Sequence, residues 1–175
     1  MKNQTALEII DIRHQKLTDS EIRAVAEIEE HPEIGKWDIP ACGGDVEKAF
    51  AGFKKYLDHI SGNEFLVAKL DGRLAGFATI HRIEGEIGEM SHVGEISIAV
   101  HPDFQRKGIG TELLRSSVNL AKARRFERLE ADILAHNKAA VGLFKKGGFK
   151  LEGTRKKRVR VDKEYYDEAC YALLI

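Results

Sequence analysis

The feature that most constrains the fold is a short loop that joins an apolar strand to an amphipathic helix and carries two closely spaced glycines. The sequence predicts the strand over residues 94–100 and the helix over about 110–125, with Gly108 and Gly110 at the junction. Glycine has no Cβ, so the backbone can approach a ligand closely. The free N–H groups and the dipole at the start of a helix favour a pyrophosphate. The loop therefore predicts a phosphate-binding turn; a plain tight turn with solvated cations is the alternative.

Two other phosphate motifs are absent from the sequence. There is no GxxxxGK run followed by Ser or Thr, and the dinucleotide pattern GxGxxG would need glycine where the chain has Leu113. The run Gln105-Arg106-Lys107-Gly108-Ile109-Gly110 instead resembles the Q/R-x-x-G-x-G/A signature of the GNAT superfamily of CoA-dependent N-acetyltransferases. Residues 98–102 look like the family's strand before that loop, and residues 137–149 are similar to its second signature, N-x-x-A…L-Y-x-x-x-G-F. The resemblance covers roughly residues 65–175.

The resemblance implies that the chain uses acetyl-CoA as co-substrate and holds no metal. The pantetheine arm would bond to the strand backbone where the strand splays from its neighbour, as an added strand does, and loop N–H groups would hold the pyrophosphate. Asn137 would contact the cofactor near its thiol; a plain helix N-cap is the alternative for this residue. The residues implied to bind the cofactor are Ile98, Ala99, Val100, Arg106, Lys107, Gly108, Ile109, Gly110, Thr111, Asn137 and Phe144.

Acetyl transfer to an amine requires a group that removes a proton. An amine with a pKa of ~10.4 is only about one part in a thousand neutral at pH 7, so a general base is expected. Glu95 is the first candidate, because it lies on the strand that carries the cofactor, and Asp132 on the next strand is the second. The alternative for each is a solvated or structural carboxylate. His81, His92 and His101 are weaker candidates.

One residue departs from the family pattern. The family often has a tyrosine that protonates the departing thiolate where this chain has Phe144, which has no proton to give. A thiol pKa of ~8.5 makes the thiolate a tolerable leaving group without an acid. Tyr165, Tyr166, Tyr171 or a water could substitute. A non-catalytic sensor that binds acyl-CoA is the alternative to an enzyme.

The periodicity of the whole chain predicts the order β-α-α-β-β-β-α-β-α-β-β, a mixed α/β (α+β) fold in a single domain over residues 1–175. The resemblance implies a single mixed, mostly antiparallel sheet flanked by helices. Residues 18–20 and Asp45 supply candidate helix caps, and Asp71-Gly72 suits a tight hairpin turn. Residues 31–44, with two prolines and three glycines, predict an irregular loop.

Charge is balanced overall but divided along the chain. The 28 basic and 28 acidic residues give a net charge of zero, which argues against a nucleic-acid partner. Residues 1–95 carry a net charge of −7 and residues 96–175 a net charge of +7. The basic run 155–161 lacks interleaved aromatics, and its alternating valines favour a half-exposed strand of a hairpin.

The cysteines and the apolar stretches of the chain bear on where the protein is located in the cell. Cys42 and Cys170 form no zinc pattern, and two reduced thiols are expected. No apolar stretch approaches the ~18 residues of a membrane helix, and the first residues, MKNQTALEII, lack the apolar region expected of a secretory signal. We therefore expect a cytoplasmic protein without a membrane partner. A homodimer remains open.

The function predicted from the sequence is transfer of an acetyl group from acetyl-CoA to an amine of a small molecule. The acidic half of the chain favours a cationic acceptor, with glutamates of the 84–89 loop (Glu84, Glu86 and Glu89) near the entrance. Acetylation of a protein N-terminus or lysine is the alternative within enzymes. No motif in the sequence identifies the acceptor.

Overall fold

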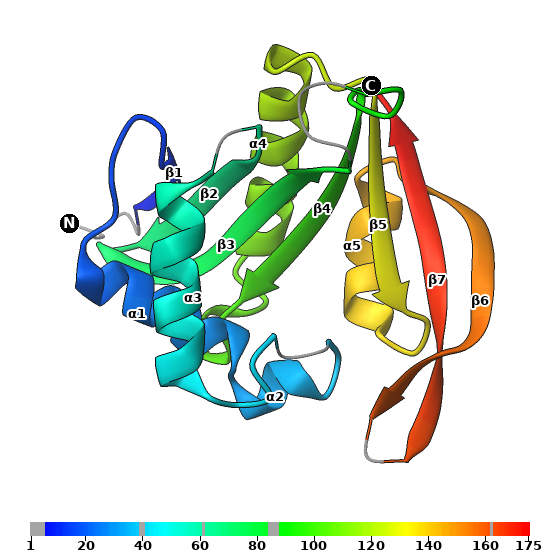
Figure 1. The fold of residues 1–175 in the computed structure, drawn as a ribbon, viewed down its shortest axis with the longest axis horizontal. Coiled ribbons are helices and arrows are strands. Elements are labelled where there is room, and N and C mark those ends of the chain that lie inside the picture. The colour runs from blue at the N-terminus through cyan, green and yellow to red at the C-terminus, as the bar shows by residue number, and fades with distance from the viewer. Residues whose placement is uncertain (1–5, 39–40, 61, 84–87, 162) are drawn as a thin grey trace.

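A seven-stranded sheet organises the computed structural model, which describes residues 6–38, 41–60, 62–83, 88–161 and 163–175 (Figure 1). The strand order is β1-β2-β3-β4-β5-β7-β6, and every neighbouring pair is antiparallel except β4 and β5. The strands are β1 (Leu7–Asp11), β2 (Glu64–Leu70), β3 (Arg73–Arg82), β4 (Val93–Val100), β5 (Arg128–Leu134), β6 (Lys150–Val161) and β7 (Glu164–Leu174). This confirms the predicted mixed, mostly antiparallel sheet.

Helices flank both faces of the sheet. They are α1 (Asp19–Glu29), α2 (Pro32–Gly35), α3 (Val46–Asp58), the 3-10 turn η1 (Pro102–Phe104), α4 (Ile109–Ala123) and α5 (Lys138–Lys146). Helices α1 and α3 cover the β2–β4 half from one side, which we call the front, and α4 and α5 lie behind the sheet (Figure 1). In the described part of the chain no helix covers β5, β7 and β6 on the front.

Local sequence signals explain where the helices and the first hairpin begin and end. The Thr18 side chain and Glu21 form a capping box at α1, and the Asp45 side chain accepts from the Lys48 N–H at α3. Residues 71–72 turn β2 into β3 with positive φ at both positions, as an Asp-Gly hairpin requires.

The region predicted as an irregular loop differs from that expectation. It contains the short helix α2, which starts at Pro32 and is capped by the His31 side chain. Proline is favoured in the first turn because its missing N–H is not needed there.

Two apolar layers fix the sheet between the helices. In front, Val25 and Ile28 of α1 pack with Phe65 and Phe77 of the sheet. Behind it lies a cluster contributed by α4, α5, β4, β5 and β7 that includes Ile96, Leu114, Leu129, Phe144 and Tyr171. Alternation along each strand therefore sends the other side chains of β4 and β5 to the front.

The basic run lies in β6, as its alternation predicted. Its side chains are exposed apart from buried Val159 and half-buried Val161. Cys42 and Cys170 are both free thiols. None of the helices in the described residues is long and apolar enough to cross a membrane.

Candidate active site

The sheet opens between β4 and β5. Strand β5 pairs with β4 only over Val93–Glu95, and the two strands then diverge (Figure 1). The His101 N–H donates to the Ala75 carbonyl at 2.9 Å. Because bonded positions alternate along an antiparallel strand, the N–H and C=O groups of Ile98 and Val100 point toward the β5 side. They offer an extended ligand the edge of a strand.

The neighbouring residue Ala99 does not share this orientation. The same alternation turns its N–H and C=O toward β3, and its side chain is buried with Val25 and Phe77. Ala99 therefore packs in the front layer, and its contact with the cofactor stays a prediction. The Gln105 Nε2 donates to the Val100 carbonyl at 3.1 Å, so one group of the open edge already has a partner.

The helix after β4 begins without a side-chain cap. Thr18, Asp45 and Asn137 cap α1, α3 and α5 with their side chains, whereas α4 begins at Gly108, whose φ is 84° and which supplies no such bond. The left-handed φ explains the glycine. The N–H groups of residues 109–111 point out of the helix start, where they can bind an anion.

Two cations accompany this helix start. Arg106 is exposed and has a positive φ of 62°. The Lys107 Nζ donates to the Asp103 carbonyl at 3.0 Å and lies 5.2 Å from the centre of the Phe104 ring. The structure thus brings the glycines and both cations of the sequence motif together at one end of the opening.

Asn137 caps α5 and also bonds to the segment after α2. Its side-chain oxygen accepts from the Ala140 N–H at 3.0 Å, and its Nδ2 donates to the Trp37 carbonyl at 3.1 Å. The Trp37 ring lies 5.6 Å from the His136 ring. The N-cap alternative for Asn137 is therefore confirmed, and its side chain is engaged with the segment after α2.

Phe144 lies in the hydrophobic core. It is 4% exposed and meets the Phe149 ring edge to face at 5.0 Å. The ring packs between α5 and β5, and its contact with the cofactor stays a prediction. Among the tyrosines that could replace its missing hydroxyl, Tyr171 is buried in the same core, and Tyr166 lies 4.8 Å from the His136 ring.

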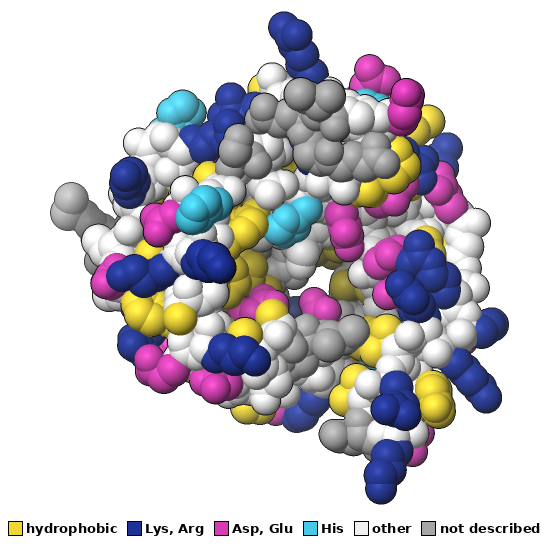
Figure 2. Space-filling model, viewed as in Figure 1, with side chains coloured by type: hydrophobic (Ala, Val, Ile, Leu, Met, Phe, Trp, Pro, Cys, Tyr) yellow, Lys and Arg dark blue, Asp and Glu magenta, His cyan; other side chains and the backbone are white. Residues whose placement is uncertain are grey.

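A cavity of about 400 Å³ opens on the front beside β4. Side chains of Phe77, Thr79, His81, Glu95 and Ser97 from β3 and β4 line it together with residues of α1, α3 and the segment between them. Figure 2 shows this face hollowed near its centre, with acidic side chains at the edge of the hollow. The cavity has the size of a small-molecule site.

Glu95 joins the opening to the cavity. It is the last β4 residue paired with β5, and its side chain lines the cavity. Glu95 is an exposed residue, and the partial desolvation of its carboxyl raises its pKa. The charges of Asp132, Glu130 and Glu168 raise this pKa further, while Arg155 opposes them. A carboxylate with a raised pKa is a stronger base than an ordinary one.

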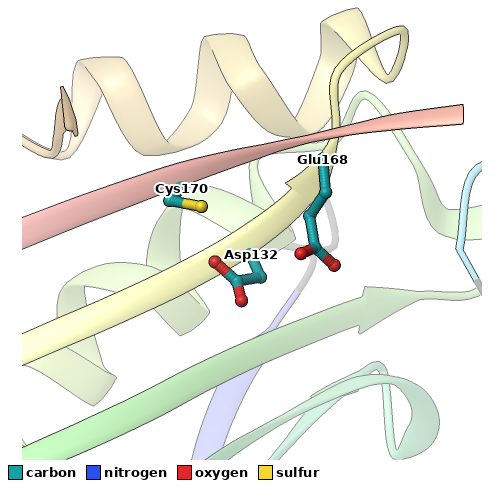
Figure 3. Close-up of side chains that lie close together, drawn as sticks. All are labelled: Asp132, Glu168 and Cys170. Carbon is teal, nitrogen blue, oxygen red and sulfur yellow. The ribbon is translucent and has the colours of Figure 1, made fainter. Parts of the chain in front are cut away.

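Asp132 has a different environment. Figure 3 shows Asp132 of β5 beside Glu168 and Cys170 of β7, with both carboxylates on one side of the sheet. The Arg155 guanidinium forms ion pairs with Asp132 and with Glu168, the latter at 2.7 Å. The three ligand atoms lie within 4.8 Å of one another, close enough for a metal ion, but Arg155 already supplies the positive charge. Asp132 is thus an ion-pair partner in this structure.

Sequence reasoning missed Glu29. This residue ends α1 and lines the cavity together with Glu95. Burial, then the charges of Asp38 and Glu30, raise the pKa of Glu29 to about 7. In the sequence Glu29 is one of several glutamates on a helix, and no local pattern distinguishes it. Tyr56 was missed for the same reason; its buried hydroxyl has no hydrogen-bond partner among the described residues.

The weaker candidates are distributed over the molecule. His81 lines the cavity, and burial lowers its pKa. His101 instead caps η1, where its Nδ1 accepts from the Asp103 N–H, and His92 is exposed before β4. Glu84 and Glu86, expected at the entrance, lie outside the described residues, and Glu89 is exposed and absent from the cavity lining.

These features define a class of protein. A strand edge left open by β4, followed by a helix whose first N–H groups are uncapped, fits a ligand with an extended amide arm and a pyrophosphate, as acetyl-CoA has. A cavity lined by a basic carboxylate adjoins that edge. The fold and the site together are those of an acyltransferase that uses a CoA thioester.

The chain belongs to the acetyltransferase (GNAT) family, whose family model matches residues 24–149. It is 29% identical over 161 residues to the L-amino acid N-acetyltransferase AaaT of Escherichia coli K12, covering 90% of this chain and 93% of the relative. It is also 29% identical to the ribosomal protein bS18 alanine N-acetyltransferase of Salmonella typhimurium LT2, covering 79% and 92%. The protein is therefore an N-acetyltransferase, and acetyl-CoA is its co-substrate.

Solved structures support the fold. A GNAT superfamily phosphinothricin acetyltransferase from Sinorhizobium meliloti in complex with acetyl-CoA superposes with a TM-score of 0.78 at 20% identity. The alignment covers 97% of this chain and 88% of that chain. The likeness in fold extends over nearly the whole chain.

Proposed function

We propose that the protein transfers the acetyl group of acetyl-CoA to a primary amine of a small cationic molecule, with Glu95 as the general base. The observation that carries this proposal is the position of Glu95. It stands where β4 leaves β5, so its carboxylate lies between the open strand edge and the cavity. An amine in the cavity would be within reach of both the base and a thioester along β4.

The proposed reaction consists of proton transfer to Glu95 and the replacement of a C–S bond by a C–N bond. Glu95 first accepts one proton from the ammonium and passes it to solvent, which leaves a neutral amine. The amine nitrogen then attacks the thioester carbonyl, and Glu95 accepts the second proton as the amide nitrogen forms. The new C–N bond replaces the C–S bond, and the sulfur leaves as a thiolate. Phe144 supplies no proton, but a thiol pKa of about 8.5 permits departure without an acid. Uncapped N–H groups at the start of α4 and the backbone of Ile98 and Val100 hold the co-substrate in position.

The size of the cavity supports a small acceptor. The two relatives described above act on L-amino acids and on the alanine of a ribosomal protein, so the family comparison leaves both acceptor types open. A cavity of about 400 Å³ walled by α1 and α3 suits a whole small molecule. Glu29 and Glu95 in its lining favour a positive charge on that molecule.

Two isosteric substitutions test the base. We expect Glu95→Gln to lower kcat by ~10²-fold or more, while the Kd for CoA, measured by calorimetry, stays nearly constant. Asp132→Asn is the matched comparison, since Asp132 is paired with Arg155, and we expect a loss of less than about tenfold. A large loss in Asp132→Asn with a mild effect of Glu95→Gln would reverse the two roles.

A further inference from the structure

The charges that line the acceptor cavity are of one sign. Glu29 and Glu95 are its acidic side chains, and among the described residues that line it there is no Lys or Arg. His81 could supply a positive charge, but burial lowers its pKa and favours the neutral ring. A ligand carboxylate in this cavity would face two carboxylates and meet no cation.

Aromatic rings form part of the lining, beside the polar side chains of Thr79, His81 and Ser97. Phe53 and Tyr56 of α3 and Phe77 of β3 form one wall, and the rings of Phe53 and Phe77 meet edge to face at 5.9 Å. Gly52 of α3 leaves room beside them. An aliphatic or aromatic body fits the rings of this wall, since it buries apolar surface against them.

We propose that the acceptor is a small amine with an apolar or aromatic body and no free carboxylate, and that Glu29 is the residue that excludes the carboxylate. This inference rests on the proposed function, because it refines the acceptor of the same site. Glu29, whose pKa is about 7, is mostly charged above that pH, which is where the acceptors are compared. An ammonium group favours this charged form, whereas a second anion beside Glu29 and Glu95 is repelled. Glu29 thus selects among acceptors, whereas Glu95 removes the proton from the amine.

A matched pair of acceptors tests the exclusion. Phenethylamine and L-phenylalanine share a ring, a chain and a primary amine, and they differ in the carboxylate. With saturating acetyl-CoA and thiol release as the readout, we expect kcat/KM for phenethylamine to exceed that for L-phenylalanine by about 20-fold or more. Equal values, or a preference for L-phenylalanine, would overturn the inference and leave acetyl transfer to small amines intact.

Variants on one helix assign the exclusion to Glu29. In Glu29→Gln we expect the ratio of the two kcat/KM values to fall about fivefold or more, since one of the two repelling charges is gone. Glu27→Gln is the control, because Glu27 is exposed on the same helix and does not line this cavity. An unchanged ratio in a folded Glu29→Gln protein would refute the role of Glu29.

A third acceptor separates failure of the inference from failure of the proposed function. A short peptide with a free N-terminal alanine carries no carboxylate beside its amine. Acetylation of this peptide alone would refute both a small acceptor and the inference. Turnover of L-phenylalanine above phenethylamine refutes only the inference, because a small amine is still acetylated.

Discussion

The co-substrate side and the acceptor side of the site are built in different ways. The first consists of backbone groups from a continuous stretch, the outward edge of β4 and the uncapped start of α4. The second consists of side chains that α1, α3, β3 and β4 bring together from distant parts of the sequence. Backbone geometry suits a ligand that a whole family shares, whereas side chains can change from one relative to the next without disturbing the fold.

The two sides also differ in charge. Arg106 and Lys107 accompany the start of α4, where a pyrophosphate would lie, while Glu29 and Glu95 line the acceptor cavity. The division between the halves of the sequence is therefore repeated locally at the site. With the proposed cationic acceptor and the anionic acetyl-CoA, each side would meet a ligand of opposite charge.

The largest effect is expected where backbone approach is essential. A Cβ on Gly110 would lie 3.4 Å from the Leu143 Cδ2 and 3.8 Å from the Val100 Cγ2, which are ordinary contacts, whereas the two branches of valine add further bulk beside Val100 of the open strand edge. We expect Gly110→Val to remain folded and to weaken CoA binding by about 100-fold or more, about 2.7 kcal/mol. Calorimetry gives the Kd, and circular dichroism reports the fold.

Two other variants show whether the effect belongs to that position. Gly110→Ala adds only the tolerated Cβ, so we expect a smaller loss of affinity than in Gly110→Val. Gly153→Val places the same bulk on β6, where nothing lies within 4 Å of the added Cβ, and should leave the Kd unchanged. An unchanged CoA affinity in folded Gly110→Val would break the assignment of the co-substrate side.

The same contrast explains what could be predicted from the sequence. The strand, the glycine loop and the helix of the co-substrate side are local, so pattern and spacing identified them. The caps Thr18 and Asp45 and the turn at residues 71–72 are local too, and the structure confirms them.

Properties set by distant partners could not be read in this way. In the sequence Asp132 resembles a solvated strand carboxylate. The register of β6 on β7 places Arg155 opposite Glu168, and from there Arg155 forms an ion pair with Asp132. Phe144 stands at the position of a family tyrosine, yet the packing of α5 buries its ring. Glu29 becomes a cavity residue only because α1 crosses the front of β4. The environment of each of these three residues depends on tertiary contacts, and such contacts leave no periodic pattern in the sequence.

A pH profile sharpens the assignment of Glu95 on the acceptor side. If Glu95 is the base, kcat/KM for the acceptor rises with pH as Glu95 loses its proton, and its raised pKa moves this rise above the range of an ordinary carboxyl. Glu29 titrates in the same cavity with a pKa of about 7. The profiles are therefore compared in the Glu29→Gln background at saturating acetyl-CoA.

The charges of Asp132 and Arg155 should shift the rise of kcat/KM with pH, its acid limb, in opposite directions. Asp132 raises the pKa of Glu95 and Arg155 lowers it. We expect Asp132→Asn to shift the acid limb of the pH profile to lower pH and Arg155→Gln to shift it to higher pH. Shifts in one common direction, or none, would show that the limb belongs to another group.

The smallest expected effect is that of ionic strength on the rate at which the enzyme encounters a cationic acceptor. The carboxylates of the cavity raise the local concentration of a cation, and salt screens that attraction over a Debye length of ~8–10 Å. For a cationic amine at saturating acetyl-CoA, we expect kcat/KM to fall roughly twofold between low and physiological ionic strength. The dependence on ionic strength should weaken in Glu29→Gln and persist in Glu27→Gln, which removes an exposed charge outside the cavity.

An amine that is mostly neutral at the assay pH is the matched acceptor, and its kcat/KM should change little. A flat response for the cationic amine would show that the acidic lining selects among acceptors only after they have entered, because repulsion of a carboxylate inside the cavity does not require long-range attraction of a cation.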